Sequence, residues 1–276
     1  MKKIVLFFIC AFCLTFYLYT SREKSSAGTL RGLDPENIDM LEIKGKNPIL
    51  LSRTGSEWKF SDGLRADRRK IEAFISFFYR SSPGIALTAD VSRESEFNIG
   101  PDSPVMVFRA GDKKISFILG LPEDRRNSFY LKYEGEAGIY ELPGSLALPD
   151  TIDMAEMKIF TRQNPEKITI STKGKKLDFI SNGGLWENRE LEDFNKDISK
   201  AINSFLFSRA KALYKNEKKN SPIFKLELFY SDGEKLEYEG NFRTNGCAIS
   251  CAEYPSYTFI CEDKDFSPLI SLFNRK

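Results

Sequence analysis

Apolar and polar positions alternate in short runs along most of this chain, and the runs occur in the same order twice. In each half, three runs with a period of two precede a helical pattern, and the third run contains a tryptophan, Trp58 or Trp186. These are the only tryptophans, and they lie 128 residues apart. Such alternation predicts half-buried β-strands. The strands expected up to the tryptophans are 38–44, 48–53 and 57–60, and 167–172, 176–181 and 184–187.

An amphipathic helix is expected after each tryptophan. Apolar residues recur there at spacings of three and four, which places them on one helical face. The two sets are Ile71, Phe74, Ile75 and Phe78, and Ile198, Ala201, Ile202 and Phe205. Asp67 is the expected N-cap of the first helix, and the second helix should cover about 192–207. Further strands are expected at 105–109, 114–119, 128–133 and 138–142, and at 225–230, 235–239, 248–251 and 257–261.

Together these elements predict an α+β fold built as a tandem duplicated domain, in which each repeat is an antiparallel sheet covered by one amphipathic helix. Repeat domain one is expected at 34–145 and repeat domain two at 163–273, with a connector around Pro149. Both tryptophans should be buried at equivalent places against their helices. Apolar positions agree between the repeats while polar identities mostly differ, which favours a shared fold without a shared active site.

The N-terminal segment 1–27 has the pattern of a signal anchor. Lys2 and Lys3 precede an uncharged, mostly apolar run of 17 residues, Ile4 to Thr20. As a helix this run would rise about 25 Å, which is short for a membrane span but longer than most signal-peptide cores. An anchor is therefore favoured over a cleaved signal peptide. The leading lysines predict a cytoplasmic N-terminus, so the expected location is the cell membrane, with a single N-terminal span and extracytoplasmic C-terminal domains.

The composition excludes several classes of function. Histidine is absent, which removes the commonest general base, the usual zinc ligand and every Ser-His or Cys-His nucleophile. The 41 basic and 39 acidic residues nearly balance, which disfavours a nucleic-acid binder. No glycine loop for phosphate is present, and Asp263-Lys264-Asp265 is interpreted as a solvated turn because it lacks the glycine of a calcium loop. We therefore expect no catalytic, cofactor-binding or metal-ligating residues and no cofactor.

Two further groups of residues leave alternatives open. Three cysteines follow the predicted anchor, Cys247, Cys251 and Cys261. In an oxidising compartment they allow one disulfide and one free thiol, with the pairing dependent on strand register; the other interpretation is buried small apolar residues.

Four basic residues gather at the start of the first helix, where the helix dipole disfavours cations. They are Arg65, Arg68, Arg69 and Lys70. A solvated face is the favoured interpretation of this cluster. The alternative is a surface for anionic lipid or an acidic partner.

The order of elements resembles the domain-of-unknown-function 4340 family. The matching residues are Trp58, Ala66-Asp67, Ile71, Leu119-Gly120, Tyr130-Leu131-Lys132 and Ile139-Tyr140. The second repeat matches only through Trp186, Ile198 and the strand pattern, and Phe97-Asn98-Ile99 departs from the family's usual aromatic-Gly-Leu. Asparagine also tolerates a left-handed backbone, so the turn there is expected to survive. The resemblance implies an extracytoplasmic, membrane-anchored protein associated with accessory components of gliding-motility-type ABC transporters, and it supplies no catalytic residues.

The expected function is a non-enzymatic, membrane-anchored extracytoplasmic interaction module. An accessory subunit of an ABC transporter is the form of it that the resemblance implies. Its expected contacts are the membrane, through the N-terminal helix, and a protein partner in the envelope, with no nucleic acid. The alternative is a cell-envelope hydrolase or glycan-binding protein that uses Asp and Glu side chains. Two close buried carboxylates in one cleft would favour the hydrolase.

Overall fold

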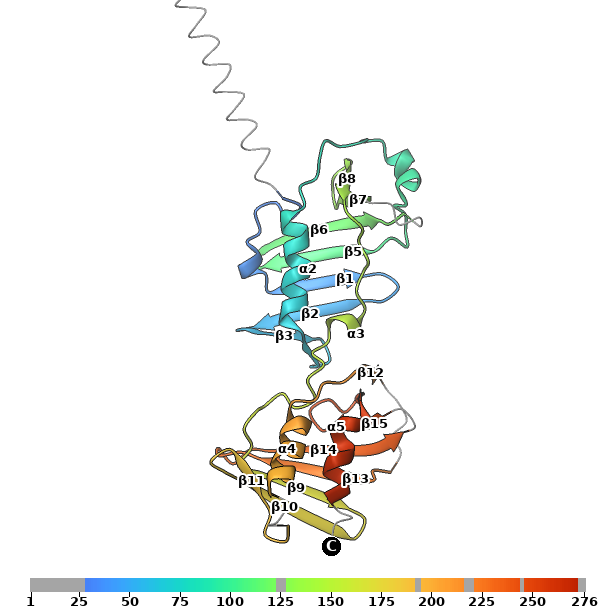
Figure 1. Cartoon of the computed structure of the whole chain (residues 1–276). Helices are drawn as coiled ribbons and strands as arrows, with labels where there is room; N and C mark the ends of the chain where they lie inside the picture. The colour runs from blue at the N-terminus through green and yellow to red at the C-terminus, as the bar shows by residue number, and fades with distance from the viewer. Residues whose placement is uncertain (1–27, 123–127, 192–194, 216–220, 244–245, 273–276) are drawn as a thin grey trace, which may run out of the picture. The chain divides into compact units, whose positions relative to one another are not determined.

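A computed structural model describes residues 28–122, 128–191, 195–215, 221–243 and 246–272 of the 276-residue chain (Figure 1). The chain divides into two compact units at Ala155 and Glu156. Each unit contains an eight-stranded sheet in which all strand pairs are antiparallel. The fold is therefore mostly β with a few helices, and the predicted α+β class with two sheet units is confirmed.

The first unit begins with a short 3-10 helix, and its long helix follows the fourth strand. Its elements are η1 (Pro35–Asn37), β1 (Met40–Lys44), β2 (Ile49–Thr54), β3 (Glu57–Phe60), β4 (Arg65–Ala66), α2 (Arg68–Arg80), η2 (Val91–Phe97), β5 (Val105–Ala110), β6 (Lys113–Gly120), β7 (Ser128–Tyr133), β8 (Ile139–Pro143) and α3 (Thr151–Met154). The strand order is β4-β3-β2-β1-β5-β6-β7-β8.

The second unit has a closely similar order and ends with a helix. Its elements are β9 (Lys167–Thr172), β10 (Lys175–Asn182), β11 (Leu185–Glu187), α4 (Asn195–Leu206), β12 (Ala212–Lys215), β13 (Phe224–Phe229), β14 (Lys235–Arg243), β15 (Gly246–Cys251), β16 (Tyr257–Cys261) and α5 (Asp263–Ser271). The strand order is β11-β10-β9-β13-β14-β15-β16-β12. Seven strands therefore follow one another as in the first unit, while β4 and β12 lie at opposite edges.

Helix α2 crosses the sheet of the first unit and forms its core (Figure 1). The Asp67 side chain accepts a hydrogen bond from the Arg69 backbone N–H at 3.0 Å, so the predicted N-cap is confirmed. From the buried face of the helix, the Phe78 ring lies 5.5 Å from that of Phe108 and 5.4 Å from that of Phe117. The predicted apolar stripe is thus the face that packs on the strands.

The core of the second unit contains two helices rather than the single one predicted. Phe205 of α4 packs against Phe266 of α5 with ring centroids 4.9 Å apart, and both side chains are fully buried. The expectation of a solvated turn at Asp263-Lys264-Asp265 is wrong, because these residues form the first turn of α5. Aspartates in a first turn favour helix formation by opposing the positive end of the helix dipole.

The predicted signal anchor lies in residues 1–27, outside the described residues. Within the described residues, no helix is long and apolar enough to cross a membrane. The longest of them, α2, has 13 residues, which gives a rise of about 20 Å against a hydrocarbon core of about 30 Å. The prediction of a transmembrane helix, and with it of a cell-membrane location with extracytoplasmic domains, is wrong on this finding.

The three cysteines of the second unit are free thiols, and all are buried. Cys247 of β15 and Cys261 of β16 are directly opposite each other in the strand register. Burial raises the pKa of Cys247 to about 12 and that of Cys251 to about 11. In this state the cysteines behave as small core residues, which was one of the two interpretations of the sequence.

Candidate functional site

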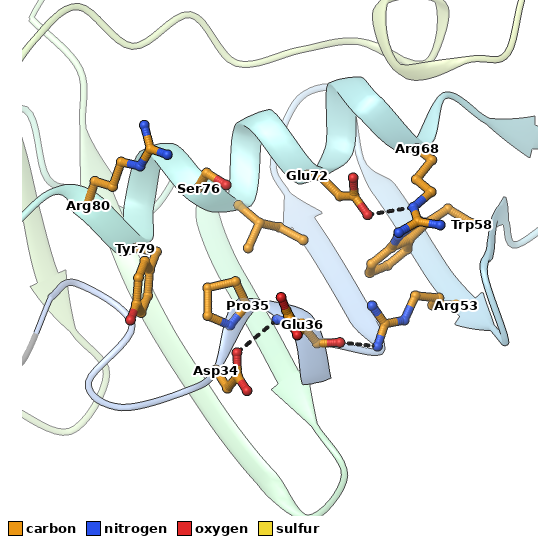
Figure 2. A pocket seen from close by; sticks show the side chains of 11 residues that line it. Asp34, Pro35, Glu36, Arg53, Trp58, Arg68, Glu72, Ser76, Tyr79 and Arg80 are labelled. Carbon is orange, nitrogen blue, oxygen red and sulfur yellow. Dashed lines mark hydrogen bonds and ion pairs between the residues drawn. The ribbon is translucent and has the colours of Figure 1, made fainter.

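A cavity of about 740 Å³ lies in the first unit between η1, the β2–β3 hairpin and α2; we call it the α2 pocket (Figure 2). Its lining is mostly charged and aromatic. The lining residues are Asp34, Pro35, Glu36, Arg53, Trp58, Arg68, Glu72, Ile75, Ser76, Tyr79 and Arg80. Its volume is within the range of small-ligand and side-chain sites.

The η1 side of the pocket is held by hydrogen bonds within its own loop. The Asp34 carboxylate caps η1 by accepting from the Glu36 backbone N–H at 3.0 Å and from Asn37 Nδ2 at 2.9 Å. Arg53 of β2 donates from Nη2 to the Glu36 carbonyl oxygen, which ties the loop to the sheet (Figure 2). The Asp34 carboxylate therefore accepts hydrogen bonds within the loop, and one N–H group of Arg53 donates to the loop.

Trp58 of β3 is a buried residue that lines the α2 pocket. It is the direct cross-strand partner of Arg53, whose guanidinium carbon lies 5.8 Å from the centre of the indole. Trp58 is only 1% exposed, and its indole Nε1–H has no hydrogen-bond partner within the described residues. A buried indole N–H usually has a partner, and leaving one without an acceptor destabilises the fold.

Two arginines of α2 line the pocket, and within the described residues only one of them has a hydrogen-bond partner. Arg68 Nε donates to Glu72 Oε1 at 2.6 Å, one helical turn away. Arg80 makes no hydrogen bond or ion pair with any residue that the structure describes, and Tyr79 beside it is 49% exposed. The pocket therefore opens to solvent along this face of the helix.

The predicted basic cluster does not form one continuous surface. Of its members, only Arg68 lines the α2 pocket. Arg65 forms an ion pair with Glu57 at 3.4 Å, and Lys70 donates to the carbonyl oxygen of Asp153 at 2.6 Å. The cluster is thus divided between separate local contacts.

The second unit has a cavity of about 480 Å³ at the corresponding place, which we call the α4 pocket. Trp186 lines it and pairs across strands with Ser181, as Trp58 pairs with Arg53. Here the indole is satisfied, because Trp186 Nε1 donates to Asn203 Oδ1 of α4 at 3.2 Å. The two tryptophans thus occupy matching positions, and both are buried as predicted.

The carboxylates of the described residues do not gather in a buried site. No Asp or Glu among them is buried. Burial raises the pKa of Asp265, at the start of α5, whereas the Arg31 hydrogen bonds lower that of Glu136. In the same part of the chain, no group of three or more Cys, Asp or Glu side chains is arranged to hold a metal ion.

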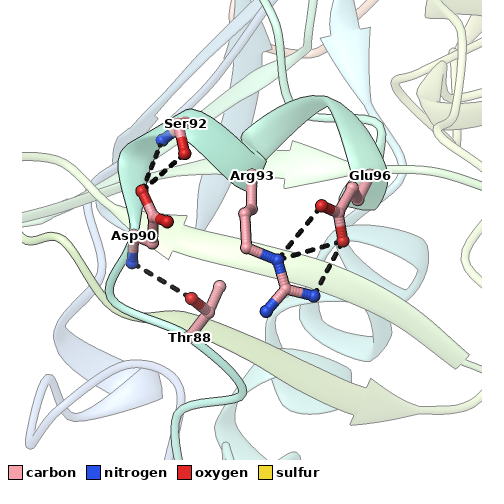
Figure 3. A network of polar contacts seen from close by, with 5 residues as sticks. All are labelled: Thr88, Asp90, Ser92, Arg93 and Glu96. Atoms are coloured by element: carbon pink, nitrogen blue, oxygen red, sulfur yellow. Dashed lines mark hydrogen bonds and ion pairs between the residues drawn. The ribbon is translucent and has the colours of Figure 1, made fainter.

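A polar network around η2 has a structural explanation (Figure 3). Asp90 accepts from the backbone N–H and the hydroxyl of Ser92 at 3.0 and 2.7 Å, which caps η2 and holds the pKa of Asp90 below its usual value. Arg93 pairs with Glu96 at 2.8 Å. The 3-10 helix ends at Asn98, which is left-handed (φ 53°, ψ 34°), so the turn expected at this position is present.

Sequence reasoning missed most of the α2 pocket. It placed Trp58 in a strand and Arg68 in a helix, but it did not connect them with Arg53. One signal was available: a two-residue Gly55-Ser56 turn makes Arg53 and Trp58 cross-strand partners, and such partners share one face of the sheet. The contribution of η1 had no comparable local signal.

No protein-family model matches this chain, and no curated protein matches it. The resemblance to the domain-of-unknown-function 4340 family is not tested by these comparisons and stays a prediction. The site must therefore be interpreted from its own geometry.

Proposed function

We propose that this protein is a non-enzymatic interaction module and that it binds a protein partner at the α2 pocket. The observation that carries the proposal is the buried Trp58 N–H, which has no partner within the described residues and belongs to a side chain that lines a pocket together with three arginines. A polar group that is left unsatisfied in the free protein can be satisfied in a complex. Aromatic and arginine side chains are also the residues that most often dominate binding energies.

The comparison of the two units supports a binding role and a tandem duplication in which each repeat is a sheet covered by helix. Seven strands follow the same order, and each tryptophan lies under the first long helix of its unit. The two pockets nevertheless differ in nearly every polar side chain.

The hydrolase alternative receives less support. Acid–base chemistry without histidine needs a carboxylate, lysine, tyrosine or cysteine with a strongly shifted pKa near the substrate. In the α2 pocket the Asp34 carboxylate caps η1, and that of Glu72 pairs with Arg68. The family resemblance implies that the partner is a component of an ABC transporter. This part of the proposal is supported by the resemblance and by no contact in the structure.

A site-specific cross-linking experiment tests the proposal. A photoreactive phenylalanine analogue replaces Tyr79, which lines the pocket and is 49% exposed, and in a matched control it replaces Tyr214 of β12, which is 51% exposed and lies in the other unit. We expect one protein to be captured at position 79 but not at 214. That protein is then identified by mass spectrometry, purified, and titrated against the wild-type chain and Tyr79→Ala.

Weaker binding of the purified partner to Tyr79→Ala, with unchanged thermal unfolding, would support the proposal. Equal capture at both positions, or equal affinity of the variant and the wild type, would refute it.

A further inference from the structure

Resting on the proposed function, we propose that the α2 pocket recognises an acidic side chain of the partner. Its carboxylate is bound by the Trp58 indole N–H together with the guanidinium groups of Arg53 and Arg68. These three side chains come from adjacent strands and from the first turn of α2, and all line the same cavity (Figure 2).

The chemistry of Trp58 determines that the ligand must supply an acceptor. An indole N–H can only donate a hydrogen bond. Trp58 is 1% exposed, and its Nε1 has no acceptor within the described residues. A carboxylate oxygen is a strong acceptor for such a donor, whereas an ammonium or an aliphatic group would leave it unsatisfied.

The two arginines favour a negatively charged acceptor over a neutral one. Each guanidinium has five N–H donors, and the contacts described use Nη2 of Arg53 for the Glu36 carbonyl and Nε of Arg68 for Glu72. No contact within the described part of the chain uses the other donors of these two groups, and arginine binds a carboxylate through paired hydrogen bonds. The Asp34 carboxylate does not compete, because it caps η1.

The α4 pocket is an internal control for this inference. Asn203 lies five residues after Ile198 and accepts the hydrogen bond of the Trp186 indole; Ser76 lies five residues after Ile71 and makes no such contact with Trp58. The cross-strand partner of Trp186 is the neutral Ser181. The second unit thus supplies its own acceptor for the indole, and the arginine that lines its pocket, Arg162, is paired with Asp232 and Glu234. In the first unit, Arg53 and Arg68 line the pocket, and the indole has no acceptor within the described residues.

An acidic protein segment fits the α2 pocket better than an anionic lipid surface. The site is a cavity of about 740 Å³, so one side chain can enter it. Asp34, Glu36 and Glu72 also line it, and their charges would oppose a plane of many anions. A single carboxylate meets less of that repulsion, because Asp34 caps η1 and Glu72 is paired with Arg68.

Nuclear magnetic resonance gives a direct test, because the chain has only two tryptophans and therefore two indole N–H signals. The 276-residue chain, labelled with nitrogen-15, is titrated with the capped peptide acetyl-Gly-Glu-Gly-amide and with its neutral counterpart acetyl-Gly-Gln-Gly-amide. Trp186→Phe assigns the signals. We expect the glutamate peptide to shift the Trp58 indole signal downfield and to leave that of Trp186 in place. The glutamine peptide should bind about tenfold more weakly, as expected for loss of a charge-assisted hydrogen bond.

Variants separate this mechanism from a general charge effect. Arg68→Gln should weaken binding of the glutamate peptide about tenfold, whereas Arg69→Gln, one residue along the same turn and outside the pocket lining, should not change it. Ser76→Asn places an amide at the position equivalent to Asn203, so it should shift the Trp58 signal without peptide and abolish the response to it.

Three results would overturn the inference: an unmoved Trp58 signal, equal responses to the two peptides, or a response to phosphatidylserine vesicles alone. The purified partner from the cross-linking experiment separates the two proposals. If it binds Arg68→Gln as tightly as the wild type, the interaction module stands and carboxylate recognition fails. If no partner is captured but the peptide response occurs, carboxylate recognition stands and the protein-partner function fails.

Discussion

Replacing each tryptophan by phenylalanine should cost different amounts of stability, although the two positions are equivalent in the fold. Both rings are buried, Trp58 at 1% and Trp186 at 4% exposure. The loss of ring contacts is therefore similar in the two variants and largely cancels in their comparison. The two positions differ in the hydrogen bonding of the indole N–H. That of Trp186 donates to Asn203, whereas that of Trp58 has no partner among the described residues.

The expected difference follows from hydrogen-bond energetics. Trp186→Phe loses a net hydrogen bond, worth about 1 kcal/mol. Trp58→Phe loses none and instead removes a buried unsatisfied donor, whose penalty is about 1–3 kcal/mol. Trp186→Phe should therefore destabilise its unit by about 2–4 kcal/mol more than Trp58→Phe destabilises its own. Trp58→Ala, which empties the site, should cost about 3–5 kcal/mol.

Hydrogen exchange followed by mass spectrometry is the suitable assay, because tryptophan fluorescence is changed by the substitutions themselves. Peptides covering β3 report the first unit and peptides covering β11 the second, so each free energy of opening is measured within its own sheet. Equal costs for the two phenylalanine variants, or a larger cost at Trp58, would refute the reasoning about the unsatisfied donor. A cost below about 1 kcal/mol for Trp58→Ala would contradict the burial itself.

Three further predictions address other parts of the molecule. Iodoacetamide at pH 8 should label Cys247 and Cys251 only after unfolding, because both are buried and their pKa values are raised to about 12 and 11; rapid labelling of either residue in the folded protein, located by peptide mapping, would contradict this. Gly120→Ala should destabilise the first unit by about 1–3 kcal/mol in urea unfolding, since its Cβ would lie 2.0 Å from the Phe97 carbonyl oxygen; an unchanged midpoint would count against the described packing. Hydrogen bonds from Arg31 lower the pKa of Glu136, so the stability they add is present above the ordinary value of 4.5 and is lost as the pH falls through the lowered one. Glu136→Gln should flatten this acid dependence of the melting temperature, and an unaltered pH profile would refute it.

Local patterns were sufficient for most of the secondary structure. The strands Glu57–Phe60, Ser128–Tyr133, Lys167–Thr172 and Tyr257–Cys261 have the bounds that alternation predicts. The Asp67 cap and the stripe containing Phe78 were also correct. Such features depend on residues within about one or two turns of each other, so the sequence contains the information directly.

Elements with weak local signals were missed. Helix α5 begins with charged residues and has Pro268 in its interior, and this local pattern predicts a turn. The segment is helical because Phe266 and Leu269 bury one of its faces in the core. Strands β4 and β12 have only two and four residues, and each exists because it pairs with one neighbour at a sheet edge. In these cases tertiary contacts outweigh local propensity.

The sequence by itself determined the three strands up to each tryptophan and the helix after it, the burial of both tryptophans and the lack of histidine chemistry, because periodicity and composition are local or additive properties. Only the tertiary structure decided that α2 and η1 enclose a cavity over Trp58, that Arg53 and Arg68 line it together, and that Asn203 satisfies one indole while the other has no acceptor within the described residues. Those facts depend on distances between segments far apart in the chain, and such distances are set by strand pairing and core packing rather than by any local pattern.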